Sequence, residues 1–209
     1  MRAILRLAQE SHNVHGVKEI LKRLETYCKD RKLDDVLKTF GKPLDGSGIS
    51  KIEAAVGQKL PSDFVELLKM HNGFDVSVSW SISGGPEIIG DYNVNCDLLK
   101  GGDFDDGRND QVKAAPGVKS VWWSEKWIPF AYNGAGDCLV FDMDPASGGT
   151  KGQVVRFYHD DGDRRLLANN FVEWFDKEVE AFIDYTEKHL EKEGKASETP
   201  PAKKSWWPW

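Results

Sequence analysis

Apolar residues recur at helical spacing through the first part of the chain, with charged residues between them. Such spacing places the apolar side chains on one face of a helix. Gly41 and Pro43 then predict a stop, and residues 41–48 a turn. We expect residues 1–44 to form a helical arm that packs on the rest of the protein or caps it. The two apolar sets are Val17, Ile20, Leu21 and Leu24, followed by Leu33, Val36, Leu37 and Phe40.

Two further helices are predicted directly after this turn. The first follows Ser50, carries Ile52 and Val56, and ends at Gly57. The second covers residues 62–71: proline before it suits a first helical turn, and an early aspartate complements the helix dipole. Asn72-Gly73 predicts a left-handed cap at its end.

The hydrophobic period changes to two after Gly73. Apolar residues alternate with serines over residues 76–83, which predicts a half-buried strand with its serines facing solvent. Residues 87–112 are polar and acidic, and we expect mostly loop with some helix. Three short apolar runs, at residues 127–130, 138–141 and 153–158, predict further strands separated by glycine-rich turns.

A last amphipathic helix is predicted over residues 170–184, and the chain beyond residue 186 is charged and ends in KKSWWPW. We expect residues 187–209 to be a disordered tail, in which Trp206, Trp207 and Trp209 are either part of that disorder or a short docking motif. Helices, then strands, then a helix indicate the α+β class: an antiparallel sheet with helices packed on one side.

Charge and composition restrict the function. The net charge of −6 argues against nucleic acid, and no apolar run is long enough for a membrane span. The N-terminus lacks the apolar core of a secretory signal, so we expect a cytoplasmic protein. Cys28, Cys96 and Cys138 are far apart and odd in number, which predicts reduced thiols rather than a disulfide framework or a zinc site.

Four kinds of catalytic or cofactor site are weakly supported. Residues 159–163 (HDDGD) resemble a solvated hairpin turn more than a metal site, because metal ligands converge from separate elements. In residues 101–110 the glycine comes one position too early for a calcium loop. No phosphate-binding loop occurs, and no serine or cysteine forms a pattern with a histidine. We expect no cofactor, no metal and no enzymatic activity.

Acidic loops and tryptophans are the candidate binding features. Residues 87–110 hold seven carboxylates against two basic residues, and residues 137–163 hold six against two. Adjacent residues of a strand face opposite ways, so one of Trp122 and Trp123 is expected to be exposed, unless the N-terminal arm covers both. The predicted partner-binding residues are Asp103, Asp105, Asp106, Asp160, Asp161, Trp122 and Trp123.

Three blocks of sequence resemble the SUKH superfamily, which includes the yeast Smi/Knr cell-wall-assembly regulators. The resemblance covers residues 45–186, and Val56 is a minor departure where the family usually has Leu. The first block carries Glu53, Gly57, Leu60-Pro61, Asp63-Phe64 and Asn72-Gly73. The second carries Trp127-Ile128-Pro129-Phe130 and the turns at 134–137, 142–145 and 152–154, and the third Ala168, Phe171, Glu173 and Trp174.

The resemblance implies an α+β fold and two kinds of function. Bacterial relatives are immunity proteins that neutralise toxins, and eukaryotic relatives are regulatory scaffolds. Our hypothesis is a non-catalytic immunity protein that binds a cognate basic toxin, such as a nuclease, through an acidic face. The alternative is a regulatory scaffold of the Smi/Knr type. A third possibility, a hydrolase with its site in the acidic loops, is not supported by any catalytic pattern in the sequence.

Overall fold

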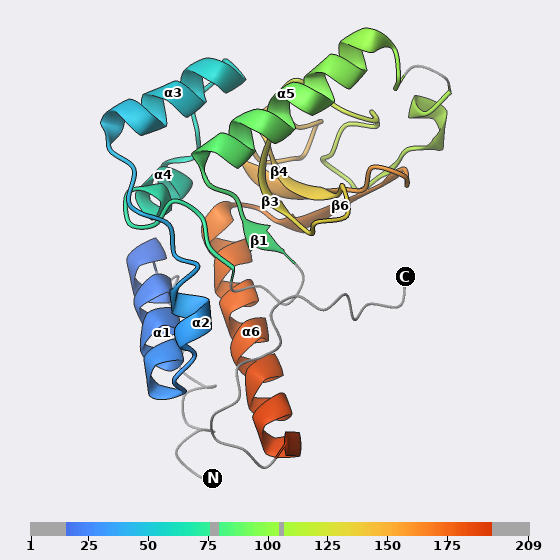
Figure 1. Cartoon of the computed structure of the whole chain (residues 1–209). Helices are drawn as coiled ribbons and strands as arrows, with labels where there is room; N and C mark the ends of the chain where they lie inside the picture. The colour runs from blue at the N-terminus through green and yellow to red at the C-terminus, as the bar shows by residue number, and fades with distance from the viewer. Residues whose placement is uncertain (1–15, 76–79, 105–106, 194–209) are drawn as a thin grey trace.

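A computed structural model describes residues 16–75, 80–104 and 107–193 of the chain (Figure 1). Four helices come first: α1 (Val17–Asp30), α2 (Asp34–Leu37), α3 (Gly46–Val56) and α4 (Ser62–Leu68). Helix α3 begins four residues before Ser50, because the Asp45 side chain accepts a hydrogen bond from the Gly48 amide at 2.8 Å and caps the helix there.

Six strands form one sheet in the order β1-β3-β4-β5-β6-β2. Every pairing is antiparallel except that of β2 with β6, which is parallel. The α+β class and the antiparallel sheet are therefore confirmed, and the three apolar runs are β3, β4 and β5. The strand bounds are β1 (Ser81–Ile82), β2 (Lys113–Ala114), β3 (Trp127–Tyr132), β4 (Cys138–Asp142), β5 (Gln153–Phe157) and β6 (Asp163–Ala168).

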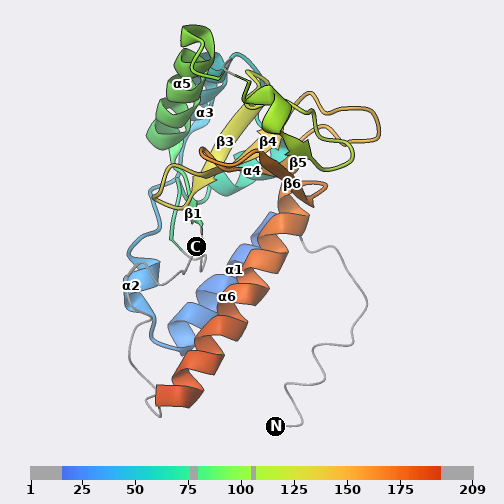
Figure 2. The same ribbon diagram turned by 90° about the vertical axis from the view of Figure 1, so that its right-hand side faces the viewer.

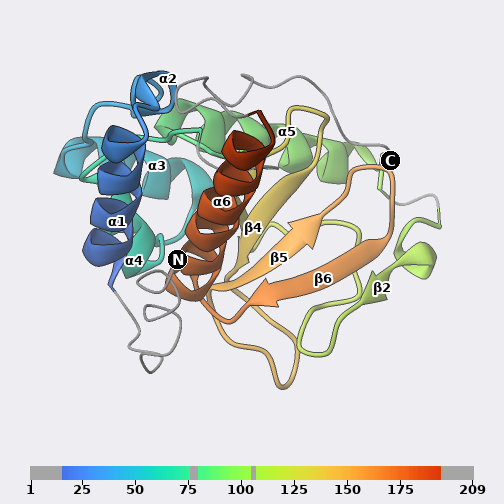
Figure 3. The same ribbon diagram turned by 90° about the horizontal axis from the view of Figure 1, so that it is seen from below.

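One face of the sheet carries the main hydrophobic core. Phe130 and Phe141 stack with ring centroids 4.0 Å apart, and Phe64 of α4 and Phe171 pack against them. Phe171 begins α6 (Phe171–Glu193), which lies across this face in Figure 3. Both helices predicted to pack on the sheet do so.

The opposite face of the sheet carries a second core. Helix α5 (Gly85–Gly101) lies on the other side of the sheet from α6 in Figures 1 and 2. Its 17 residues fall where mostly loop was expected. The sheet therefore has helices on both sides, whereas helices on one side only were expected. Described residues between the end of α5 and residue 123 cover this face of the sheet, and Phe104 and Val118 are buried there.

The start of α5 also explains a wrong prediction about the serines. Strand β1 is only two residues long, and Ser81 and Ser83 are 2 % and 1 % exposed rather than facing solvent. The Ser83 amide donates to the carbonyl of Phe130, so the chain turns inward against β3 before the helix begins. Residues 76–79 of the expected strand lie outside the described residues.

Helix α1 packs beside α6 and contributes to the main core, with Val17, Ile20, Leu21, Leu24 and Cys28 fully buried. Arg23 pairs with Asp176 at 2.6 Å, and Arg31 pairs with Glu187 at 2.8 Å. Helix α6 continues through residues 187–193, where a disordered tail was expected, and the Arg31 contact lies at the start of this extension. The expectation for residues 194–209 and their tryptophans lies outside the described residues.

Candidate partner-binding surface

Both tryptophans proposed as partner anchors are buried. Trp122 is 2 % exposed and Trp123 is 3 % exposed, so the expectation that one of them faces outward is wrong. The residues lie in an irregular segment rather than a strand, and the alternation rule does not apply to them. The alternative, in which the N-terminal arm covers both tryptophans, is also wrong, because both are enclosed in the second core.

Two arginines hold Trp122 in place. The guanidinium carbons of Arg108 and Arg164 lie 4.8 and 4.9 Å from its rings. Arg164 is fully buried, stacks on Phe157, and donates to the carbonyl oxygens of Trp122 and Asp161. Burial lowers the pKa of Arg164 to about 10, which leaves the side chain cationic at neutral pH. The arginine therefore ties the Trp122 segment to the sheet.

Several of the predicted acidic residues, unlike the two tryptophans, are exposed to solvent. Asp103, Asp160 and Asp161 are exposed, whereas Asp105 and Asp106 lie outside the described residues. The parallel pairing of β2 with β6 brings the segment containing Asp110, also exposed, beside the turn at residues 160–162, because the Lys113 amide donates to the carbonyl of Gly162. We call Asp103, Asp110, Asp160 and Asp161 the acidic edge.

Four carboxylates from the second acidic run already have partners within the protein. Asp163 pairs with Arg156 at 2.9 Å and Arg165 at 2.6 Å, and Asp144 pairs with Lys119. Asp142 is fully buried and accepts from the Gln153 amide, and Asp137 lies against His159. The charge offered to a partner is therefore smaller than the sequence tally, and Asp160 and Asp161 are its main contribution from this run.

Asp137, His159 and Asp160 bring three potential metal-ligand atoms within 4.8 Å of one another. Asp137 directly precedes β4 and the other two residues lie in the turn after β5, so groups from separate segments do converge here. However, one Asp137 oxygen already accepts from the backbone amide of His159 and lies 2.8 Å from its ring nitrogen, and the other accepts from Asn133. This geometry describes a hydrogen-bonded pair that joins two turns.

The cysteines have no reactive setting. All three are free and buried. Burial raises the pKa of Cys28 to about 12 and raises that of Cys138 as well, which keeps both thiols protonated. Both side chains are packed in hydrophobic cores, in agreement with the interpretation as ordinary thiols.

A small hollow lies where α5 begins. It measures about 200 Å³, and Asn72, Asp75, Ser83, Glu87 and Tyr132 are among the residues that line it. Three backbone segments meet here: the Gly41 amide donates to the Gly73 carbonyl, and the Asn72 side chain accepts from the Gly85 amide at 2.8 Å. A Cβ on Gly73, at φ 81°, would lie 2.6 Å from the Gly84 nitrogen, which requires glycine at this crossing.

The outer face of α5 joins the hollow to the acidic edge. Val94 is 58 % exposed and Leu98 is 37 % exposed, and they are the large apolar side chains most open to solvent among the described residues. They follow Glu87 on the same helical face, at i+7 and i+11, and Asp103 comes two residues after the helix ends. One ridge therefore has a hollow at one end, apolar side chains along it and carboxylates at the other end.

The sequence model of the SMI1 / KNR4 family (SUKH-1) matches residues 43–177, well over half of the chain. The chain belongs to this family. No curated protein sequence matches it. Domains of the SMI1/KNR4 family generally serve as non-catalytic protein-interaction modules. None of the helices in the described residues is both long enough and apolar enough to span a membrane.

Motif residues of the SMI1/KNR4 domain connect neighbouring elements of the fold. Glu53 accepts from the Leu60 amide at 3.3 Å and connects the end of α3 to the turn before α4, while Asn72 caps the start of α5. Sequence reasoning placed Asn72-Gly73 at the end of the helix, but α4 ends earlier, at Leu68, and the role of Asn72 at α5 was missed. The signal was present in Gly84-Gly85-Pro86, which predicts a helix start that we interpreted only as the break of a strand.

Proposed function

We propose that this SMI1/KNR4 domain is an immunity-type protein that binds a basic toxin, such as a nuclease, and blocks it by occupying its surface. The acidic edge carries the proposal: its four exposed carboxylates come from the end of α5, the segment before β2 and the turn before β6, and the pairing of β2 with β6 brings the last two of these segments together. Family membership supports a binding role without chemistry. Asp105 and Asp106 belong to the same stretch of sequence as Asp103 but lie outside the described residues.

Charge and apolar contact have separate tasks in this mechanism. The acidic edge attracts the positive partner over the distance that salt leaves unscreened, about 8 Å at physiological ionic strength, and this raises the association rate. Val94 and Leu98 then lose their exposed surface, which lowers the dissociation rate. The buried Trp122 and Trp123 contribute only by keeping the second core rigid.

The first experiment is affinity capture of partners from cells of the source organism with three forms of the chain. The test variant changes Asp103, Asp160 and Asp161 to Asn. The control variant makes the same change in net charge far from the edge, at three exposed positions of α1 and α6: Asp30→Asn, Glu180→Gln and Asp184→Asn. A basic protein recovered by wild type and control but lost by the test variant is the expected result.

Binding kinetics and activity of that partner then test the mechanism. The association rate of wild type is expected to fall as salt rises, and that of the test variant is expected to be lower and nearly independent of salt. One equivalent of the chain is expected to abolish the partner's toxicity when the two are expressed together. Recovery of only neutral or acidic partners, or association that salt does not affect, contradicts the proposal.

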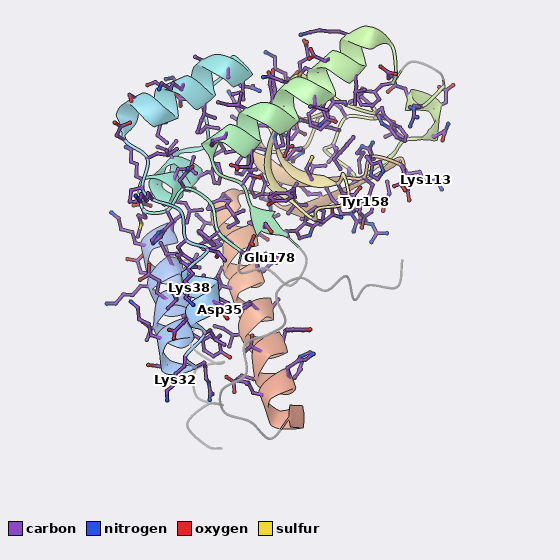
Figure 4. All side chains as sticks on the ribbon, viewed as in Figure 1. Lys32, Asp35, Lys38, Lys113, Tyr158 and Glu178 are labelled. Atoms are coloured by element: carbon purple, nitrogen blue, oxygen red, sulfur yellow. The ribbon has the colours of Figure 1, made fainter. Side chains whose placement is uncertain are left out.

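A regulatory scaffold is the second candidate, and the structure offers one observation in its favour. Helix α1 and the last turns of α6 lie outside the family match and form an arm. In Figure 4, Lys32 marks the lower end of this arm, whereas Lys113 of β2 lies at the opposite end of the molecule. Two separate surfaces suit a protein that joins partners. A partner captured through the arm, with unchanged activity in the complex, favours the scaffold.

A further inference from the structure

We propose that the outer face of α5 is the docking site for an amphipathic, basic helix of the protein partner. The inference deepens the proposed function and rests on it, because it names the part of the basic partner that α5 receives. The outer face consists of the residues that share one side of the helix: Glu87, Gly90, Asp91, Val94, Asp97, Leu98 and Gly101.

Exposed apolar surface lies in the middle of this face. Val94 is 58 % and Leu98 is 37 % exposed, and no other large apolar side chain in the described parts of the chain is as open to solvent. The inner side of α5 is already occupied, because the helix packs on β3 and beside α3 (Figures 1 and 2). The two apolar residues are four positions apart and form a row along the helix. Such a row fits the groove between the side-chain rows of a second helix.

Gly90 continues this row by one turn and leaves a gap in it. The residue is exposed inside the helix, its φ is not positive, and a Cβ built on it would meet no atom within 4 Å. Neither the backbone conformation nor the packing of the described residues therefore requires glycine here, and alanine would stabilise the helix. The missing side chain does allow a neighbouring helix to come close, because the distance between two packed helices depends on the side chains where they cross.

The charges beside the apolar row select a basic helix. Glu87 and Asp97 are exposed, and Asp91 is half-buried. The only basic residue of α5, Lys100, lies on another side of the helix, with its ammonium nitrogen 4.0 Å from the Glu125 carboxylate. The face therefore combines an apolar row with carboxylates and has no cation of its own. A helix with an apolar stripe bordered by lysine or arginine is complementary to it.

The acidic edge continues this charge beyond the end of α5. The Asp103 carboxylate lies over Gly101, since a Cβ on that glycine would be 2.9 Å from the Asp103 oxygen. A helix of 17 residues is about 25 Å long, so the outer face offers several turns to a partner helix. A basic segment that the acidic edge attracts therefore arrives beside the apolar row.

A second copy of the chain is a poor alternative occupant. The chain carries a net charge of −6, and a symmetric pair of α5 helices would bring the same carboxylates against each other. Like charges at close range repel, and no cation on the face offsets them. An anionic membrane surface is disfavoured for the same reason.

The test uses two peptides of identical composition and different pattern. Both have about 14 residues, half leucine and half lysine; the leucines recur at helical spacing in one and alternate with lysine in the other. The full chain, labelled with nitrogen-15, is titrated with each peptide at physiological salt. The helical peptide is expected to shift the amide signals of Gly90, Val94 and Leu98 in a saturable way. The alternating peptide is expected to bind at least tenfold more weakly.

Gly90→Ala is the critical variant, because stability and binding are expected to change in opposite directions. Alanine is expected to raise the unfolding temperature by about 2–4 °C and to weaken binding of the helical peptide at least fivefold. Asn93→Ala is the matched control, since Asn93 is exposed on a different side of the same helix. It is expected to raise the unfolding temperature as well and to leave peptide binding unchanged.

Two further variants test the apolar and acidic parts of the face. Leu98→Ala is expected to weaken binding of the helical peptide about fivefold. Asp97→Asn is expected to weaken it and to reduce its dependence on salt. Equal binding of the two peptides, saturable shifts only outside α5, or wild-type affinity of Gly90→Ala would overturn the proposal. Dimerisation of the chain that Leu98→Ala abolishes would assign the face to a second copy instead.

The two proposals can fail separately. If a basic partner depends on the acidic edge but dissociates from Gly90→Ala at the wild-type rate, the proposed function stands and this inference fails. If the helical peptide binds α5 as expected but no basic partner depends on the acidic edge, the function proposed above is wrong and the docking surface remains.

Discussion

Replacing Trp123 by alanine tests whether this residue supports the fold or the partner. The side chain is 3 % exposed and makes edge-to-face contacts with Trp127 and Phe157 at 5.7 and 4.9 Å. Its removal takes away the buried surface and leaves a cavity between the sheet and the covering segment. Core Trp→Ala changes cost about 3–5 kcal/mol, a large part of the 5–15 kcal/mol that stabilises a typical domain.

Trp123→Phe separates the ring contacts from the indole nitrogen. The Nε1 atom of Trp123 is buried without a hydrogen-bond partner among the described residues. A smaller ring therefore loses packing but also removes an unpaired polar group, so we expect a much smaller loss than for alanine. Val94→Ala is the exposed control, and its effect on stability is expected to stay within about 0.5 kcal/mol.

The assay is chemical unfolding followed by circular dichroism, combined with partner binding under conditions where each variant is folded. We expect Trp123→Ala to lower the unfolding free energy by about 3–5 kcal/mol and Val94→Ala to raise the dissociation rate of the partner. A stability loss below about 1 kcal/mol for Trp123→Ala, with a faster dissociation rate, would show that Trp123 is an exposed anchor in solution and refute this reasoning.

Three further predictions concern the fold. Gly57→Ala, at φ 66° with open space around it, is expected to cost about 1–2 kcal/mol, and Gly73→Ala considerably more because its Cβ meets backbone atoms; thermal unfolding of the pair measures the difference. Burial raises the pKa of Asp142, so its folded form takes up a proton more readily than its unfolded form. The contribution of Asp142 to the unfolding free energy therefore rises as pH falls through that pKa. In denaturant titrations, the stability of Asp142→Asn relative to wild type is expected to increase from pH 4 to pH 7. A difference that does not change with pH contradicts this. Glu187→Gln is expected to increase hydrogen exchange in the last turns of α6, because Glu187 holds both Tyr27 and Arg31, and unchanged exchange would show that these contacts do not order the helix.

Local sequence determined most of the regular elements. The amphipathic spacing of Val17 to Leu24 and the three apolar runs of β3, β4 and β5 specify their own conformations, because a buried face requires a fixed period. The family motif added the order of the elements. A polar stretch carries no such period, and α5 was missed because its buried face has only a few apolar residues, Ile88 and Cys96 among them.

Tertiary structure alone decided which polar and aromatic residues are available to a partner. Trp122 and Trp123 look like exposed anchors in the sequence, but the buried Arg164, 42 residues after Trp122, binds their segment to the sheet. Acidic residues near one another in sequence were separated into paired, buried and exposed groups by side chains from other strands. The hollow depends on three backbone segments that meet at Gly73, and its lining comes from residues far apart in sequence. Burial and pairing are properties of these long-range contacts, so a one-dimensional pattern specifies the elements but not the surface that they leave open.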